Sequence, residues 1–336
     1  MRATNNLTRR RLGALGIAGA AAAASSYLAR PALAASSWPD RPVRLIVPFG
    51  AGGAVDTLSR TVGHHFPRFA NGQNMVIENR TGAGGVVGGG AVATAAPDGY
   101  TLLAADIGPN VIGKALNPKL PYEPMTAFTP ILQMVKLPAV VIAGKDMPER
   151  TLADIIAASK KQPDKYVYAS AGIGNGSHLF MELLNQQAGI KMIHTPYRGG
   201  NDISLAVMRG DAQLGFPTIS SALSYIREGS LRAVAVSDPQ LSPSLPGIPA
   251  VADTIPGFDC AVWYGLAGPA GMPRDMVLRI NEVMNKILAL PEVRDSVAQT
   301  QAGMVVGGTP DDFAQHLQRE HERWAPLIRE AGITVG

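Results

Sequence analysis

The chain has 336 residues and a single cysteine, Cys260, which excludes an intrachain disulfide and a zinc site built on cysteines. Residues 1–34 hold five of its 30 basic residues and no acidic one, so 25 basic and 26 acidic residues remain beyond them, a net charge of about −1. This balance excludes the strongly basic surface that nucleic acids or anionic membranes attract, and it favours a small-molecule partner.

The first 34 residues have the pattern of an export signal. Three arginines precede a run of mainly alanine, glycine and leucine from Gly13 to Leu28, and small residues follow up to Ala34. The run falls short of the roughly 20 strongly apolar residues that a membrane anchor requires, and Arg30 interrupts its end. We therefore predict a signal peptide over residues 1–34, cleaved near Ala34, and a periplasmic protein. The arginine pair suggests the twin-arginine route, and an ordinary secretory signal stays open.

Short apolar runs alternate with helix-like stretches along the remaining chain of about 302 residues. That length exceeds what one hydrophobic core usually spans, so two domains are expected. The alternation predicts parallel α/β sheets covered by helices. A proline-rich segment from Asp238 to Val251 has no periodicity and predicts a long connection. The apolar runs lie at 43–47, 74–80, 99–106, 166–172, 191–197, 213–218 and 231–238.

The first apolar run leads directly into a glycine-rich turn. Val43–Val47 predicts a buried strand, and apolar residues at helical spacing from Val55 to Phe69 predict the helix that follows. Gly52 and Gly53 therefore lie where a strand ends and a helix begins. The first N–H groups of a helix lack intrahelical partners and carry the positive end of its dipole, so an anion could be received there. A turn in which glycine serves backbone geometry alone is the alternative.

Two further glycine clusters follow predicted strands without matching an enzyme motif. Val87 occupies the third glycine position of the dinucleotide fingerprint, so only the longer spacing of Gly82, Gly84 and Gly88 occurs, and a nicotinamide enzyme is unusual in an exported protein. The third cluster offers Ser177 and His178, but adjacent side chains point to different sides of a helix start, and the serine-hydrolase elbow is not matched. Neither cluster predicts an enzyme.

The C-terminal part carries a clear helix signal. Thr309–Asp312 supplies a capping residue, a proline at the first helical position and acidic residues in the first turn. His316, Glu320 and His321 lack the spacing of a helical zinc motif, so we predict a solvated helix face for them. Upstream, the adjacent aromatic residues at 263–264 either line a cleft or are buried for structural reasons.

Six motifs in chain order resemble one known family: PVRLIVPFGAGGAVDTLSR, VIENRTGAGGVVGG, PDGYTLL, YASAGIGNGSHL, HTPYRGG and VWYGLAGPAGMP. They are similar to the extracytoplasmic solute receptors of tripartite tricarboxylate transporters, often called the Bug family. The resemblance covers the whole chain beyond the export signal. It implies an α/β fold of the periplasmic binding protein type II-like Venus flytrap kind, with two α/β lobes joined by crossing strands. The implied lobe 1 comprises residues 36–140 and 260–336, and lobe 2 residues 141–259.

The resemblance also implies a binding site. In these receptors the loops that match Phe49–Thr57 and Ser170–Ser177 face each other and present N–H groups and small polar side chains to a small carboxylate. We expect Asp56 to hold its loop through hydrogen bonds to the backbone and not to contact an anionic ligand. The implied ligand-binding residues are Phe49, Gly52, Gly53, Ala54, Asp56, Asp106, Ala171, Gly172, Ser177, His178 and Thr218.

The implied function is a monomeric periplasmic receptor without cofactor, metal or catalysis. It would capture a dicarboxylate, tricarboxylate, acidic amino acid or aromatic acid and deliver it to the membrane subunits of a tripartite transporter. An exported α/β-cleft enzyme acting on a small carboxylated substrate is the alternative function, and an ATP-driven importer the alternative delivery system. The chain departs from the family pattern at Gly50, at Asn201-Asp202 and at Pro217-Thr218, so ligand specificity does not carry over.

Overall fold

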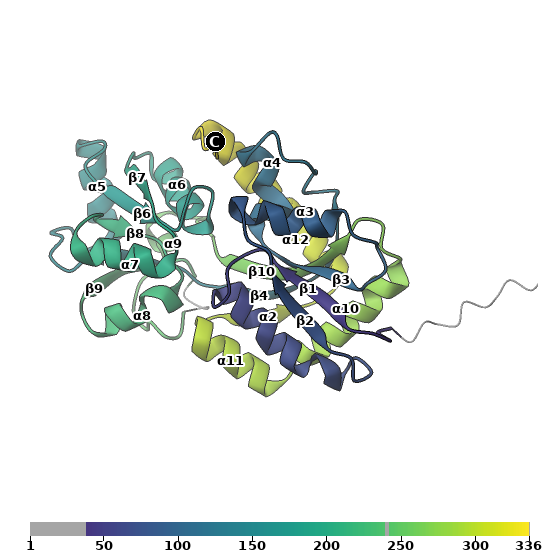
Figure 1. The fold of residues 1–336 in the computed structure, drawn as a ribbon. Helices are drawn as coiled ribbons and strands as arrows, with labels where there is room; N and C mark the ends of the chain where they lie inside the picture. Colours follow the sequence, from purple (N-terminus) through teal and green to yellow (C-terminus); the bar gives the residue numbers. More distant parts are fainter. Residues whose placement is uncertain (1–37, 239–241, 336) are drawn as a thin grey trace, which may run out of the picture. The chain divides into compact units, whose positions relative to one another are not determined.

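Two β-sheets, each covered by helices, organise the residues that the computed structural model describes, 38–238 and 242–335 (Figure 1). The chain from Pro39 onward forms one compact unit. The predicted signal peptide and its cleavage point lie outside the described residues. Over the two described ranges, no helix is both long enough and apolar enough to cross a membrane.

The first sheet has six strands, and we call it, with its helices, lobe 1. Strands β2, β1 and β3 run parallel, whereas β10, β4 and β11 are antiparallel to their neighbours. The strand order is β11 (Met304–Gly307), β4 (Phe128–Leu137), β10 (Val262–Pro269), β3 (Thr101–Ala105), β1 (Val43–Val47) and β2 (Met75–Asn79). One face carries α2 (Ala54–His65), α10 (Arg274–Leu288) and α11 (Pro291–Gln301), and the other carries α3 (Val86–Ala93), α4 (Gly113–Leu116) and α12 (Pro310–Glu330) (Figure 1).

The second sheet has five strands, and with its helices it is lobe 2. Strands β7, β6 and β8 run parallel, and β5 is antiparallel to β8 and β9. The strand order is β7 (Ile193–Pro196), β6 (Val167–Ser170), β8 (Leu214–Gly215), β5 (Val140–Gly144) and β9 (Leu231–Val236). The helices are α5 (Leu152–Lys161), α6 (Gly176–Ala188), α7 (Gly200–Arg209), α8 (Ile219–Arg227) and α9 (Val251–Thr254).

Side chains alternate between the two faces of lobe 2, as strand geometry requires. On β5, Val140 and Ile142 pack in one core cluster with residues of α7 and α8. Val141 and Ala143 belong instead to the core cluster that includes residues of α5 and α6 and continues into lobe 1. Burial on both faces explains why these strands read in the sequence as continuous apolar runs.

Each of the apolar runs contains a strand, but both sheets are mixed and not purely parallel. Strand β5 begins at Val140, directly after β4 ends at Leu137, so no crossover helix separates them. Parallel neighbours need a long crossover connection, and this short link cannot supply one within a sheet. The chain passes instead from the lobe 1 sheet to the lobe 2 sheet at this point, and it returns at β10.

The first predicted helix is shorter than its apolar spacing indicated. Helix α2 ends at His65, and a 3₁₀ turn, η2 (Phe66–Arg68), follows it. Pro67 lies inside that turn and has no N–H to donate to the carbonyl four residues earlier. The α-helical ladder therefore stops before Phe69.

Helix α12 begins as predicted, but one of its faces was misassigned. Thr309 accepts a hydrogen bond from the Asp312 N–H, and the Asp312 side chain accepts from the Thr309 N–H, which completes a capping box. Glu320 does not lie on a solvated face: its Oε2 accepts the indole N–H groups of Trp263 and Trp324, both at 2.9 Å. The prediction was wrong because a buried indole needs an acceptor, and the helix supplies this carboxylate. The described part of the chain holds no group of three His, Cys, Asp or Glu residues suited to a metal ion.

Candidate functional site

Three turns of lobe 1 meet at the carboxyl end of its parallel strands. They follow β1, β2 and β3, and the second and third include η3 (Ala83–Gly85) and η4 (Gly108–Ile112). A Cβ atom on Gly85 would lie 3.3 Å from the Phe49 ring and 3.2 Å from Pro109. A Cβ atom on Gly108 would lie 2.8 Å from the carbonyl oxygen of Gly84. Glycine is therefore needed for this close approach of the three turns.

The turn after β1 is braced by Asp56, which is 1% exposed. Its Oδ2 accepts the Gly52 N–H at 2.8 Å and Arg60 Nε at 2.9 Å. Its Oδ1 accepts Asn79 Nδ2 at 2.9 Å, and the same nitrogen reaches the Phe49 carbonyl at 3.0 Å. Asp56 thus holds the loop through a backbone hydrogen bond, as the sequence predicted.

The network around Asp56 also fixes its charge. Burial acts to raise the pKa of this carboxyl, but the hydrogen bonds from Arg60, the Gly52 N–H and Asn79 together hold the pKa below its ordinary value of 3.8. Asp56 is therefore an anion at neutral pH and already has its donors. It has no need of a ligand to satisfy it.

Helix α2 starts without a side-chain cap. Its N-cap residue is Gly53, and both Gly52 and Gly53 are exposed. Within the described residues, the N–H groups of Ala54 and Val55 donate to no protein acceptor. Gly52 has a φ of +80°, which favours glycine, whereas Gly53 has an ordinary φ of −73°. Two N–H groups at the positive end of the helix dipole thus stay open to an anion.

Three helix N-termini gather at the corresponding edge of lobe 2, because α6, α7 and α8 follow the parallel strands β6, β7 and β8. Gly199 is the N-cap residue of α7 and Thr218 that of α8, and neither makes a side-chain capping hydrogen bond to its helix. The Thr218 hydroxyl lies 3.0 Å from Ser221 Oγ on α8. A Cβ atom on Gly200, the first residue of α7, would collide with Ser221 Oγ. The starts of α7 and α8 are therefore in contact.

Several N–H groups of the loop after β6 donate hydrogen bonds within the loop and the first turn of α6. The Ala171 N–H donates to Ser177 Oγ at 2.9 Å, and the Gly172 N–H donates to Ser170 Oγ at 3.1 Å. The Gly174 N–H donates to Nδ1 of His178 at 3.1 Å. Asn175 caps α6 by accepting the Ser177 N–H. Ala171, Gly172, Ser177 and His178 therefore fix the shape of this loop, and their contact with a ligand stays a prediction.

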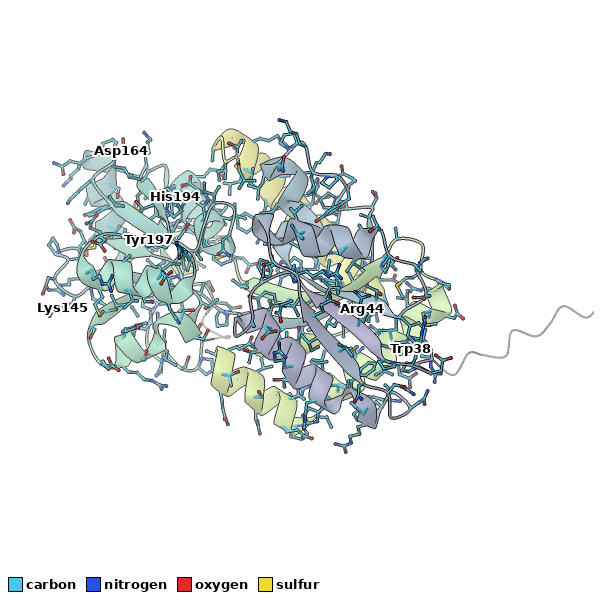
Figure 2. The ribbon with its side chains drawn as sticks, viewed as in Figure 1. Trp38, Arg44, Lys145, Asp164, His194 and Tyr197 are labelled. Carbon is cyan, nitrogen blue, oxygen red and sulfur yellow. The ribbon has the colours of Figure 1, made fainter. Side chains whose placement is uncertain are left out.

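A stack of aromatic rings supports the same loop. The rings of His178 and His194 lie 3.8 Å apart and are inclined by 9°, and Tyr168 stacks on His194 at 5.0 Å. Tyr168 and His194 are paired in register across β6 and β7. His194 Nε2 lies 2.6 Å from Ser170 Oγ. In Figure 2, His194 and Tyr197 both lie in lobe 2, on and just beyond β7.

Both histidines are neutral at neutral pH. Burial lowers the pKa of His178 to about 3, with the neighbouring His194 adding to the effect. Burial likewise lowers the pKa of His194 to about 4. A neutral ring lets Nδ1 of His178 accept the Gly174 N–H, so the loop geometry depends on this protonation state.

Asp106 follows β3 and lies beside β10. Its Oδ1 accepts the Gly108 N–H at 3.0 Å, and its own N–H donates to Asn110 Oδ1 at 3.1 Å. Burial raises the pKa of Asp106 from 3.8 to about 6, against a smaller lowering by the Gly108 N–H. Burial, with the nearby Asp106 as a second cause, also raises the pKa of Tyr264. Trp263, by contrast, is 3% exposed and has the structural role described above.

The predicted residues thus fall into two groups. In lobe 1 the structure brings together Phe49, Gly52, Gly53, Ala54, Asp56 and Asp106. In lobe 2 it brings Ala171, Gly172, Ser177 and His178 into one loop, with Thr218 at the start of α8. Across the described ranges, no hydrogen bond or ring contact joins the first group to the second.

Sequence reasoning missed several supporting residues. Arg60 could have been found, since it lies four positions after Asp56 on one helix face. Asn79 could also have been found, since it is the last residue of β2, the strand that pairs with β1. The stacking of His194 depends on the register of β6 and β7, for which the sequence carried no signal.

Comparison with known proteins identifies the family. Residues 66–333 match the family model described as the tripartite tricarboxylate transporter family receptor. The chain belongs to this receptor family. The UPF0065 protein in the tcbD-tcbE intergenic region of Pseudomonas sp. (strain P51) is 33% identical to it over 327 residues, which covers 97% of this chain and 95% of that protein.

Solved structures agree with this assignment. R. palustris Rpa4515 with adipate is 27% identical, has a TM-score of 0.78 and covers 89% of this chain and 100% of its own. MatC from Rhodopseudomonas palustris with bound malate is 30% identical, has a TM-score of 0.74 and covers 87% of this chain and 100% of its own. The predicted family, fold class and receptor function are confirmed, and a receptor of this family is periplasmic and not an enzyme.

Proposed function

We propose that this receptor binds a small carboxylate at the N-terminus of α2, with the loop after β6 as the opposing half of the site. The observation that carries the proposal is the exposed glycine turn at Gly52-Gly53, which leaves the N–H groups of Ala54 and Val55 without a protein acceptor within the described residues. An anion there gains hydrogen bonds and a favourable interaction with the helix dipole.

The ligands of the solved relatives support this chemistry. One was solved with adipate and the other with malate, and both ligands are dicarboxylates. A ligand with two charged ends could contact both lobes at once. Because such a ligand interacts more strongly with a closed form than with an open one, it would shift the population towards closure.

We further propose that residues 1–34 direct export, that cleavage occurs near Ala34, and that the loaded receptor delivers its ligand to the membrane subunits of a tripartite transporter. N-terminal sequencing of the protein recovered from the periplasm tests the cleavage. A mature chain that begins near residue 35 is expected. Recovery of the uncleaved chain in the membrane fraction would contradict the signal-peptide proposal.

Thermal-shift measurement with a panel of carboxylates tests the binding. A ligand at 100 times its dissociation constant stabilises a protein by roughly 2.7 kcal/mol, which is readily measured as a higher melting temperature. The panel holds three series: propionate, lactate and alanine; succinate, malate and aspartate; glutarate, 2-hydroxyglutarate and glutamate. We expect at least one series to stabilise the receptor, whereas neutral sugars should not.

Substitution Gly53→Val tests the location of the site. Gly53 has a φ that valine can adopt, and its Cβ would lie 3.4 Å from the Gly50 carbonyl, an ordinary contact. The fold should therefore survive while the branched side chain obstructs the approach to the helix N-terminus. We expect loss of at least 100-fold in affinity, about 2.7 kcal/mol. Ala96→Val, an exposed position before β3, is the control. Unchanged binding by Gly53→Val would remove this turn from the site.

A further inference from the structure

Among the described residues, only one of the two carboxylate oxygens of Asp106 accepts a hydrogen bond. Oδ1 accepts the Gly108 N–H at 3.0 Å, and the backbone of Asp106 is fixed by Asn110. Among the described residues the side chain accepts a hydrogen bond only at Oδ1, which leaves Oδ2 without a partner, and the residue is partly buried. One oxygen is therefore held in place while the other remains able to accept.

The surroundings of Asp106 also lack a counter-charge. The causes that shift its pKa are burial and the Gly108 N–H, with no described Lys, Arg or His among them. Partly buried carboxylates are normally paired with a cation or with several donors, because desolvation of an unpaired charge is costly. The Asp56 carboxylate, by contrast, accepts hydrogen bonds from three donor groups. Asp106 is thus incomplete without a further donor.

Asp106 adjoins the proposed anion site. Strands β1 and β3 are hydrogen-bonded neighbours, so the residues that follow them lie at the same edge of the sheet. Gly108 packs against the Gly84 carbonyl, and Gly85 packs against the Phe49 ring. On the other side, β10 pairs Gly265 with Ala105, which sets Tyr264 beside Asp106.

We infer that Asp106 and Tyr264 form a subsite that accepts a hydroxyl or ammonium substituent of the bound carboxylate. The inference rests on the proposed function, because it concerns the part of the ligand next to the carboxylate held by α2. The geometry selects a donor group: an ionised carboxylate only accepts hydrogen bonds, and it would repel a second carboxylate placed against it. The Tyr264 hydroxyl can both donate and accept, so it can orient such a substituent.

The two substituents affect the proton of Asp106 in a predictable direction. With a pKa of about 6, Asp106 is mostly ionised at neutral pH. An ammonium group beside it would favour the ionised form and lower the pKa, so binding near pH 6 would release protons. A carboxylate beside it would raise the pKa, so binding would take up protons.

Titration calorimetry of the matched acids tests the preference. For wild-type receptor we expect hydroxy or amino acids to bind about tenfold more tightly than the unsubstituted acid of the same length, since the added hydrogen bond involves a charged acceptor. Asp106→Asn should bring the ratio close to one, and Tyr264→Phe should reduce it. Asp275→Asn, an exposed aspartate in the first turn of α10, should leave the ratio unchanged.

The proton linkage is a second, independent readout. Calorimetry at pH 6 in two buffers of different ionisation enthalpy gives the number of protons exchanged. We expect wild-type receptor to release a fraction of a proton on binding aspartate, and Asp106→Asn to release none. Proton uptake on binding succinate together with tighter binding of succinate than of malate or aspartate would overturn the inference.

The outcomes separate the inference from the proposed function. If acids in any series bind but show no preference for the substituted members, the donor subsite is disproved and the carboxylate site stands. The same holds if the preference persists in Asp106→Asn. If no acid in the three series binds, the proposed function fails, and the inference fails with it.

Discussion

The Gly52 N–H donates a 2.8 Å hydrogen bond to Oδ2 of Asp56, four residues later in the first turn of α2. This bond closes the glycine turn onto its own helix, and Arg60 and Asn79 complete the shell around the carboxylate. The turn is therefore held in one shape before any ligand arrives. A preformed turn lowers the ordering cost of binding, which raises affinity.

Asp56→Ala should loosen this turn. The substitution leaves the Gly52 N–H without its acceptor and removes one of the two acceptors of the Asn79 amide, so we expect the free energy of unfolding to fall by about 1–3 kcal/mol. Affinity for the best carboxylate of the panel should fall about tenfold or more, because the turn must then be ordered on binding. Denaturant unfolding and calorimetry measure the two effects. Asp202→Ala, in the first turn of α7, is a control for removal of a first-turn aspartate on stability. Wild-type affinity in Asp56→Ala would contradict the bracing role.

Ser177→Ala tests the loop after β6. The Ser177 hydroxyl accepts the Ala171 N–H at 2.9 Å and donates to Asn175 at 3.1 Å. We expect about 1 kcal/mol lower stability and up to tenfold weaker binding, since the loop loses two internal hydrogen bonds. The unliganded melting temperature separates the two effects. Stability reduced with affinity unchanged would show that this loop does not contribute to binding.

The stacked histidines should make stability depend on pH. Their pKa values in the folded protein, about 3 for His178 and about 4 for His194, lie below the ordinary 6.5. At pH 7 both histidines are mostly neutral in the folded and in the unfolded chain, so the pair reduces stability little. Below pH 6.5 the unfolded chain takes up protons that the folded chain does not, so stability falls as pH drops from 6.5 towards 4.

His194→Gln measures this effect. At pH 5 the variant should take up about one proton fewer on unfolding than the wild type, so its stability should decline less steeply between pH 6.5 and 5. Denaturant unfolding at several pH values gives the slope. His64→Gln, at an exposed position on α2, is the control substitution. Equal slopes for wild type and His194→Gln would show that His194 is not held neutral.

The buried carboxylate of Glu320 offers a test of the core. Glu320→Leu removes the shared acceptor of Trp263 and Trp324, so two buried indole N–H groups lose their partner. We expect a fall of about 2–4 kcal/mol in the free energy of unfolding. Glu320→Gln, which keeps an acceptor oxygen, should lose less.

Tryptophan fluorescence follows the unfolding of these variants directly. The matched control is Glu322→Leu on the exposed face of the same helix. A loss in Glu320→Leu no larger than in Glu322→Leu would mean that the two indole hydrogen bonds contribute nothing measurable.

The sequence by itself determined the features that depend on near neighbours along the chain. The alternation of apolar runs placed seven strands, and the box formed by Thr309 and Asp312 placed the start of α12. Asp56 was correctly assigned to its own loop, because an aspartate in the first turn of a helix lies close enough along the chain to accept a backbone N–H of the preceding turn. The order of the six motifs identified the receptor family.

Only the tertiary structure decided which side chains meet across elements. The stack of His178 on His194 requires the register of β6 and β7, and the nearness of Asp106 to Tyr264 requires β10 to run antiparallel beside β3. Glu320 was misassigned because it has two partners, Trp263, which lies 57 residues earlier in the chain, and Trp324, one turn further along the helix. Periodicity reports which face of an element is apolar, whereas the partner of a buried polar group is set by strand order and register, which no local pattern encodes.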